Sequence, residues 1–231
     1  MKKVKTPTLT ISQHSLTPIN PITKNQEIAF EEWKDGNHLV LAGSAGTGKT
    51  FLAMYFAFDE LFKEDSYYDR VVIIRSAVAT RDQGHLPGDR KEKEDAFAAP
   101  YKQICSELFE DPSSYGKMLN AKQIMFETTS YIRGISYNNS LIIVDEMQNL
   151  NFHELDTVIT RVGKNSRIIF SGDYRQTDFR KDDEKTGIFS FMNIIEHMNN
   201  FSIVTFGWED IVRSGLVRDY IMTKEMLGVD K

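Results

Sequence analysis

The stretch of sequence that decides the fold is Gly43-Ser44-Ala45-Gly46-Thr47-Gly48-Lys49-Thr50. It has the spacing G-x-x-x-x-G-K-T and lies between two apolar runs, residues 38–42 and residues 51–62. The first run is typical of a buried strand, and the second is long enough to favour a buried helix. A glycine-rich loop at a strand-to-helix turn is the context that this spacing requires before it indicates phosphate binding.

The residue types in this loop suit a nucleoside triphosphate. The glycines let the backbone turn its N–H groups inward as a nest for phosphate oxygens, and the following helix adds its unpaired N–H groups and the positive end of its dipole. Lys49 brings a positive charge to the β- and γ-phosphates, and the Thr50 hydroxyl is placed to bind Mg²⁺. A chance match in a glycine-rich turn is the alternative. The residues expected only to shape the loop are Ser44, Ala45 and Thr47.

A second segment, residues 141–146, reads as an apolar strand that ends in two carboxylates. Ligands of open parallel sheets lie at the carboxyl ends of the strands. Asp145 is therefore expected beside the phosphate loop, where it would hold Mg²⁺ through water. Glu146 is then placed to orient and activate the attacking water as a general base. The alternative is a buried strand whose charged end residues only mark the solvent boundary.

The segment Ser171–Gln176 ends the next apolar run, residues 167–170. Gln176 carries a neutral amide that we expect near the γ-phosphate, where it would sense that phosphate and position the water. Asp173 is expected to fix the turn through side-chain to backbone hydrogen bonds. The motif is weak by itself, and its position one strand after the two carboxylates gives it meaning.

The rest of the chain alternates between apolar runs and helical patterns. Strands are predicted at residues 38–42, 70–75, 123–128, 141–144, 167–170 and 202–206. Helices are predicted at residues 26–33, 51–62, 96–109, 152–162, 186–198 and 210–227. Strands without polar alternation, each followed by a helix, are typical of a parallel sheet covered on both faces. The sequence thus predicts an α/β fold of the P-loop NTPase type.

The chain divides into an arm and one domain. Residues 1–24 contain three prolines and no hydrophobic period, which predicts an extended N-terminal arm. Residues 25–231 are expected to form a single domain. An insertion at about residues 78–121 breaks the alternating pattern, and insertions of this size are usually functional or disordered.

The composition is that of a globular protein, with 231 residues, 41% hydrophobic residues and a net charge of −5. The net charge supplies no overall positive field to hold nucleic acid. The single cysteine, Cys105, excludes an internal disulfide and fits a reducing compartment. No apolar run is long enough for a membrane span, and no apolar signal region follows the basic N-terminus. We therefore expect a cytoplasmic protein without a membrane partner.

Six segments of the chain form an ordered set of motifs: Ala45–Thr50, Gly84–Asp89, Val144–Asn149, Thr160–Gly163, Gly172–Gln176 and Asp210–Arg213. This set resembles the motifs of the PhoH-like ATPases. They span about residues 20–220, and the Leu-Pro-Gly-Asp and Thr-Arg-x-Gly segments are more specific than the phosphate loop. The family core is similar to the first RecA-like domain of superfamily-one helicases. The resemblance implies one RecA-like ATPase domain that hydrolyses ATP with Mg²⁺. Some members form hexameric rings and some act on RNA, which implies a homo-oligomer and a single-stranded RNA or DNA partner.

The resemblance also implies roles for three further residues. Gln26 corresponds to the glutamine that recognises adenine in helicase-like proteins, which implies ATP rather than GTP; the alternative is a polar residue on a short helix. Arg161 and Arg213 match arginines of the family, and one of them is expected to act as an arginine finger on the transferred phosphoryl group. Arg213 is expected to reach the nucleotide of a neighbouring copy, with Arg218 as a rival on the same helix. We expect no second RecA-like domain within this sequence, so any unwinding would require an oligomer.

Residues 75–93 are a candidate nucleic-acid-facing loop, in which His85 is suited to stack on a base. Acidic residues in the same stretch nearly cancel its charge, so a solvated charged loop is the alternative. Two other functions stay open: a nucleotide-gated binding module with slow hydrolysis, and a small-molecule kinase. The carboxylate pair favours water over a kinase acceptor, and stimulation of turnover by single-stranded RNA would separate a motor from a binding module. The basic residues of the loop are Arg75, Arg81, Arg90, Lys91 and Lys93.

Overall fold

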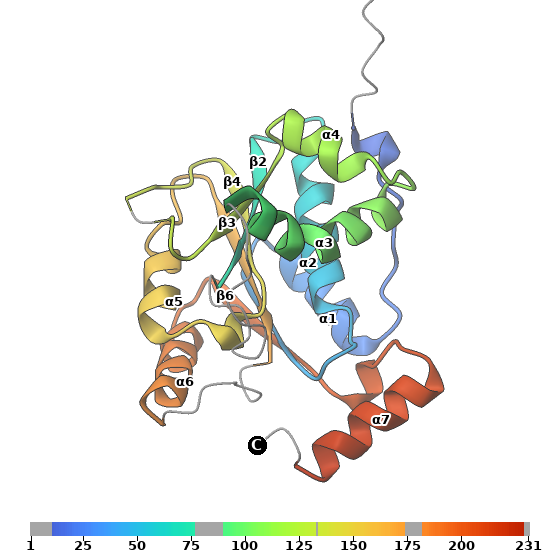
Figure 1. Ribbon diagram of the computed structural model, residues 1–231, viewed down its shortest axis with the longest axis vertical. Helices are drawn as coiled ribbons and strands as arrows, with labels where there is room; N and C mark the ends of the chain where they lie inside the picture. The colour runs from blue at the N-terminus through green and yellow to red at the C-terminus, as the bar shows by residue number, and fades with distance from the viewer. Residues whose placement is uncertain (1–10, 77–89, 133, 174–181, 229–231) are drawn as a thin grey trace, which may run out of the picture.

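Six parallel strands form one sheet through the middle of the molecule (Figure 1). The computed structural model describes residues 11–76, 90–132, 134–173 and 182–228. The strands are β1 (His38–Gly43), β2 (Arg70–Arg75), β3 (Ile124–Thr128), β4 (Ser140–Val144), β5 (Arg167–Gly172) and β6 (Phe201–Phe206). Their order in the sheet is β3-β2-β4-β5-β1-β6, and every neighbouring pair is parallel. All six strands predicted from the sequence are confirmed.

Helices cover both faces of this sheet (Figure 1). One face carries α1 (Lys24–Lys34), α2 (Lys49–Leu61), α3 (Arg90–Leu108) and α4 (Ser114–Asn120). The other face carries α5 (Phe152–Ile159) and α6 (Asp182–Glu196). The last helix, α7 (Gly215–Met226), lies at the lower right of Figure 1. Short 3₁₀ turns are η1 (Gln13–Ser15), η2 (Met147–Asn149) and η3 (Trp208–Asp210). No helix in the described ranges is long and apolar enough to cross a membrane.

The two hydrophobic cores explain why the strands read as continuous apolar runs. Successive strand residues point to opposite faces of a sheet. In β1, Leu39 and Leu41 belong to the core under α1 and α2. Val40 and Ala42 belong to the core under α5 and α6. Because both faces are covered, polar alternation would place polar side chains in one of the cores.

The described part of the region predicted as an insertion forms two helices, α3 and α4. Helix α3 includes the charged run that precedes the predicted helix at residues 96–109, and α4 was not predicted because Asp111-Pro112-Ser113 reads as a turn. Cys105 on α3 and Met118 on α4 are fully buried. The α3–α4 region therefore extends the core on the α2 face of the sheet.

Part of the predicted N-terminal arm packs against the domain. The side chains of Ile11 and Leu16 are buried in the core on the α2 face. The backbone N–H of Thr17 donates to the carbonyl oxygen of Leu108, at 2.8 Å. Residues 11–22 are therefore fixed along the domain, and residues 1–10 lie outside the described ranges.

The helix predicted at residues 210–227 is wrong in its first turn. The chain forms η3, and α7 then begins at Gly215. Asp210 is fully buried, and its Oδ2 accepts from Asn25 Nδ2 at 2.7 Å and from the Gly207 N–H at 2.9 Å. The N–H of Val212 donates to the carbonyl oxygen of Gly46. These contacts with α1 and with the loop after β1 hold the backbone in a non-helical path.

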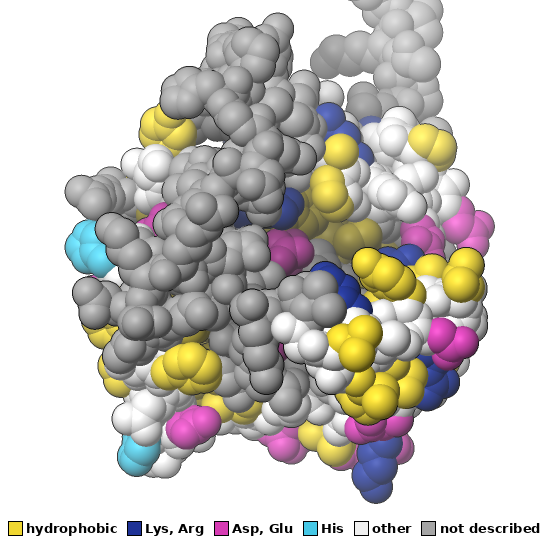
Figure 2. Space-filling model, turned by 60° about the horizontal axis from the view of Figure 1, so that its bottom comes forward, with side chains coloured by type: hydrophobic (Ala, Val, Ile, Leu, Met, Phe, Trp, Pro, Cys, Tyr) yellow, Lys and Arg dark blue, Asp and Glu magenta, His cyan; other side chains and the backbone are white. Residues whose placement is uncertain are grey.

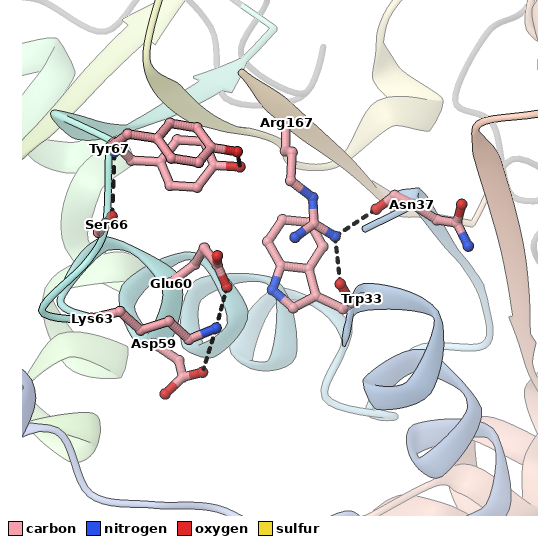
Figure 3. A network of polar contacts seen from close by, with 9 residues as sticks. Trp33, Asn37, Asp59, Glu60, Lys63, Ser66, Tyr67 and Arg167 are labelled. Atoms are coloured by element: carbon pink, nitrogen blue, oxygen red, sulfur yellow. Dashed lines mark hydrogen bonds and ion pairs between the residues drawn. The ribbon is translucent and has the colours of Figure 1, made fainter. Parts of the chain in front are cut away.

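Arg167 and Trp33 form a cation–aromatic contact at the amino-terminal end of β5 (Figure 3). Arg167 at the start of β5 donates through Nη2 to the carbonyl oxygens of Trp33 and Asn37, at 2.6 and 2.7 Å. Its guanidinium carbon lies 3.2 Å from the centroid of the Trp33 ring. Such contacts contribute more when they are desolvated. Arg167 thereby ties the α1–β1 turn to the sheet.

Candidate active site

A cavity of about 760 Å³ lies at the carboxyl ends of β1, β4 and β5. Its walls come from the loop after β1, the acidic pair after β4, the end of β5, helix α3 and the N-terminal segment. The predicted site residues that line it are Gln26, Gly43, Ala45, Gly46, Gly48, Lys49, Thr50, Asp145, Glu146 and Arg213. Segments that are distant in sequence therefore meet at the edge where a parallel sheet binds its ligands.

The glycine-rich loop has a backbone that side chains would not tolerate. Gly43, Gly46 and Gly48 have φ values of +124°, +76° and +82°. A Cβ on Gly43 would lie 2.0 Å from the carbonyl oxygen of Phe206 on β6. The hydroxyl of Thr47, which is buried, donates to the carbonyl oxygen of Ser44 at 3.0 Å. The loop is thus held by β6 and by an internal bond, in the conformation that suits an anion nest.

Lys49 is turned toward its own loop. Its Nζ donates to the carbonyl oxygens of Gly43 and Ser44, both at 2.7 Å. Burial lowers the pKa of Lys49, and nearby carboxylates, first among them Asp173, oppose that shift. The ammonium group therefore lies in a region of negative potential. The oxygens of a phosphate group can replace the two carbonyl oxygens as its hydrogen-bond acceptors.

Asp145, the first carboxylate after β4, contacts two hydroxyl groups. Its Oδ1 accepts from Thr50 Oγ1 at 2.8 Å, across 95 residues of sequence. Its Oδ2 accepts from the hydroxyl of Tyr101 on α3, also at 2.8 Å. Burial raises the pKa of Tyr101 well above its usual value, so the phenol stays a hydrogen-bond donor. Sequence reasoning missed Tyr101, because no local pattern marks a helix residue that meets a distant strand end.

Glu146, the second carboxylate, has an unusual backbone. Its φ and ψ are 53° and 46°, the left-handed region that is costly for a residue with a side chain. Burial first, and then the charge of Asp145, raise the pKa of Glu146. Gln148 Nε2 donates to Glu146 Oε2, and Gln148 Oε1 accepts from the Asp173 N–H at 3.2 Å. Gln148 therefore joins the acidic pair to the end of β5. Sequence reasoning did not single out Gln148, although it lies in Val144–Asn149, one of the segments that resemble the family, and that resemblance could have identified it.

Gln26 lies at the rim of the cavity with both ends of its amide occupied. Its Oε1 accepts from the Ile22 N–H at 3.0 Å, and its Nε2 donates to the carbonyl oxygen of Thr47 at 3.4 Å. The side chain is buried, and the Thr23 hydroxyl caps the helix on which it lies. Gln26 therefore links the N-terminal segment to the phosphate loop.

The two candidate arginines lie far apart in the fold. Arg213 lines the cavity of its own chain, and its Cγ would be 3.0 Å from a Cβ on Gly46. It precedes α7, so it is not on the same helix as Arg218. Arg161 follows α5, and its carbonyl oxygen accepts from the Tyr137 N–H near the start of β4. The described residues that line the cavity do not include Arg161.

Helix α7 contacts the outer side of the phosphate loop. The Ser44 hydroxyl donates to Glu225 Oε2 at 3.1 Å, and the indole N–H of Trp208 donates to the same oxygen at 2.5 Å. Ile221 also lies close to the position of a Cβ on Gly46. None of the 12 residues of α7, all of them described, is buried. Figure 2 shows hydrophobic side chains on the face that comes forward from the bottom of Figure 1, where α7 lies.

Some predicted residues lie outside the described ranges. They include Gln176, Arg81 and His85. For Arg90, Lys91 and Lys93 the structure describes the helical backbone of α3 and not the side chains. Arg75, at the end of β2, lies with its guanidinium carbon 5.9 Å from the ring centroid of Phe97. The predicted nucleic-acid loop therefore stays a prediction.

The sheet order, the glycine loop with its lysine and threonine, and the acidic strand end together define a protein with a P-loop ATPase fold of the RecA-like α/β type. The sequence profile of the family described as "PhoH-like protein" matches residues 18–224. The chain belongs to the PhoH-like protein family.

Two curated relatives illustrate the match. The PhoH-like protein of Mycobacterium leprae (strain TN) is 30% identical over 205 residues, which cover 88% of this chain and 57% of that protein. The PhoH-like protein of Synechocystis sp. (strain ATCC 27184 / PCC 6803 / Kazusa) is 33% identical over 184 residues, which cover 79% of this chain and 55% of that protein. The chain therefore spans a little over half the length of these relatives.

Among solved structures, the large terminase from a thermophilic bacteriophage has a similar fold. The TM-score is 0.51 and the sequence identity is 10%, over 90% of this chain and 50% of that chain. At this level of identity the likeness concerns the fold alone.

Proposed function

We propose that this chain hydrolyses ATP in the presence of Mg²⁺ at the cavity beside the phosphate loop. The observation that carries the proposal is the hydrogen bond between Thr50 Oγ1 and Asp145 Oδ1, at 2.8 Å. It brings the threonine of the glycine loop and the acidic strand end to one point. That pairing is what a site for a metal-bound triphosphate needs.

The residues present fit a triphosphate and Mg²⁺. The loop with three positive-φ glycines is followed directly by the N-terminus of α2, whose N-cap is Gly48. Both features favour an anion. Thr50 and Asp145 offer the hydroxyl and carboxylate oxygens that Mg²⁺ prefers. When bound, Mg²⁺ neutralises charge on the β- and γ-phosphate oxygens.

In the proposed reaction Lys49 leaves the carbonyl oxygens of its loop and binds phosphate oxygens. Glu146 holds and deprotonates the attacking water, and its raised pKa makes it a stronger base than an ordinary glutamate. Gln148 orients the Glu146 carboxylate through its hydrogen bond. Gln176 is proposed to sense the γ-phosphate, as its sequence position suggests.

Arg213 is proposed to stabilise charge on the phosphoryl group from within the same chain. Its position on the cavity wall beside Gly46 supports this assignment. Arg161 is the candidate for action on the nucleotide of another copy, because it lies near the amino-terminal end of β4 and is not among the described residues that line the cavity. Arginine fingers act in both ways in P-loop proteins.

The base is proposed to be adenine, bound near Gln26 and the N-terminal segment. Ile19 and Ile22 line the cavity on that side and offer apolar surface. Recognition by the amide of Gln26 would require it to exchange its bonds to Ile22 and Thr47 for bonds to the base. A comparison of ATP and GTP affinity in wild type and in a Gln26→Ala variant tests this assignment.

Coupling to single-stranded RNA or DNA and assembly into a homo-oligomer complete the proposal, and they rest on the family resemblance. The test is phosphate release from Mg·ATP with and without single-stranded RNA, together with the mass of the protein in solution with and without ATP. A large rise in turnover with RNA supports a motor. Slow turnover that RNA leaves unchanged would favour a nucleotide-gated binding module instead.

A further inference from the structure

Tyr101 contacts the candidate metal-binding carboxylate from a helix outside the P-loop motifs. It lies on α3, its side chain is 0% exposed, and its hydroxyl donates to Asp145 Oδ2 at 2.8 Å. The other carboxylate oxygen, Oδ1, accepts from Thr50 Oγ1 at the same distance. Each oxygen of Asp145 therefore has its own hydroxyl donor, one from the phosphate loop side and one from α3.

Two donors on opposite oxygens fix the plane of a carboxylate. The last torsion of an aspartate side chain is broad, so a single hydrogen bond leaves rotation about it. With Thr50 on one oxygen and Tyr101 on the other, rotation would break one bond or both. The orientation of Asp145 toward Thr50 is thus set before a ligand arrives.

A second buried tyrosine offers a comparison for this contact. Tyr137 is also buried, at 5% exposure, and its hydroxyl has no hydrogen-bond partner among the residues that the structure describes. Tyr101 differs because its hydroxyl is directed at a functional carboxylate.

Helix α3 also forms part of the cavity wall. Gln103, Ile104 and Glu107, which follow Tyr101 on the same helix, line the cavity. The ring of Tyr101 packs against Phe126 of β3, with centroids 5.8 Å apart. The phenol is therefore held against the sheet, while later residues of its helix line the cavity.

We propose that Tyr101 is a positioning residue that orients Asp145 toward Thr50 and thereby sets the affinity of the nucleotide site for Mg²⁺. The proposal rests on the proposed function, because it needs Asp145 and Thr50 to bind Mg²⁺ with the nucleotide. It adds a residue that belongs to none of the motifs. Partners that orient metal ligands typically change metal affinity by about 10-fold to 100-fold when they are removed.

The experiment compares wild type with Tyr101→Phe, which removes one oxygen and keeps the ring. The affinity for a fluorescent ADP analogue is measured in saturating Mg²⁺, in EDTA, and across a Mn²⁺ titration. We expect Tyr101→Phe to need about tenfold more Mn²⁺ for half-saturation, while its affinity in EDTA equals that of wild type. Tyr137→Phe is the matched control, and we expect wild-type values in every arm.

A second background distinguishes positioning from a structural effect. If Tyr101 acts through Asp145, Tyr101→Phe has no further effect on Mn²⁺ affinity in an Asp145→Asn protein. An equal loss of affinity with metal and in EDTA would overturn the proposal, and so would wild-type Mn²⁺ affinity in Tyr101→Phe. Absence of any Mg²⁺ effect in wild type would defeat the proposed function itself, a result visible before any variant is made.

Discussion

The ammonium group of Lys49 donates a hydrogen bond to the carbonyl oxygen of Gly43, 2.7 Å away. Gly43 is the first residue of the glycine-rich loop that contains Lys49. This bond and its partner to Ser44 place the charge where phosphate oxygens are expected. We predict that Lys49→Ala lowers ATP turnover by more than about 100-fold. Phosphate release measures this.

The control for Lys49→Ala is Lys63→Ala. Lys63 is partly exposed and pairs with Glu60 and Asp59 near the end of α2, a kind of contact that contributes little. It should keep wild-type turnover and lose at most about 1 kcal/mol of stability. Normal turnover by Lys49→Ala would remove the basis of the proposed function.

Glu146→Gln separates binding from chemistry. The amide keeps the size of the side chain and loses the base, so we predict that kcat falls by about 100-fold to 10,000-fold. Nucleotide affinity should stay near that of wild type. Single-turnover phosphate release and an equilibrium binding assay measure the two effects. Glu196→Gln, at the end of α6, is the control, and a Glu146→Gln protein that turns over normally would show that another group activates water.

Two glycine substitutions should have opposite effects on the free energy of unfolding. Gly43→Ala places a Cβ 2.0 Å from the Phe206 carbonyl oxygen at a φ of +124°, so we predict a loss of about 2–4 kcal/mol. Gly116 lies within α4, and a Cβ there meets nothing within 4 Å. Gly116→Ala should stabilise by up to about 1 kcal/mol. Urea unfolding measures both; a neutral Gly43→Ala would contradict the close approach of β6.

Cys105 should report on opening of the domain. It is the one cysteine of the chain and it is fully buried, and burial raises the pKa of its thiol. We predict negligible reaction with a disulfide reagent in native buffer and full reaction in urea. If Cys105 is labelled only when the domain opens to a state that cannot bind nucleotide, Mg·ATP at about 100 times its Kd should slow the labelling of Cys105 about 100-fold. Lys49→Ala should show no slowing, and rapid labelling of the native protein would contradict the packing of α3.

His38 should make stability depend on pH. Burial first, and then the charge of Arg167, lower the pKa of His38 below 6.5, and its Nδ1 accepts from the Ile168 N–H. As pH falls below 6.5 the unfolded chain binds a proton there that the folded chain does not, so stability falls until the folded pKa is reached. Urea midpoints between pH 7 and pH 5.5 should fall more in wild type than in His38→Asn, whose side-chain oxygen keeps an acceptor. Parallel pH profiles would refute this.

The parts of this fold that could be predicted are those that residues close together in the sequence determine. The loop at residues 43–50 contains its own glycines, lysine and threonine. The strands appear as continuous apolar runs because both faces of the sheet are covered. The carboxyl-end rule then placed Asp145 beside the loop, and the hydrogen bond to Thr50 agrees with that placement.

The parts that could not be predicted depend on contacts between distant segments. Tyr101 meets Asp145 across 44 residues, and Glu225 meets Ser44 across 181. The helix expected from residue 210 starts later because Asp210 bonds to Asn25, a competition that helical propensity does not register. Arg213 was expected on that helix, and instead it lines the cavity of its own chain.

Helix α7 has no buried residue, and Glu225 contacts the phosphate loop through Ser44. Leu216 at 82% and Met226 at 70% exposure show how little apolar area holds it in place. Segments with few buried contacts open at low cost, so its amide protons should exchange with deuterium faster than those of α2. A ligand that stiffens the phosphate loop should slow amide exchange in α7 without contacting that helix. Hydrogen–deuterium exchange measured by mass spectrometry in α7 would then report whether the phosphate loop is occupied.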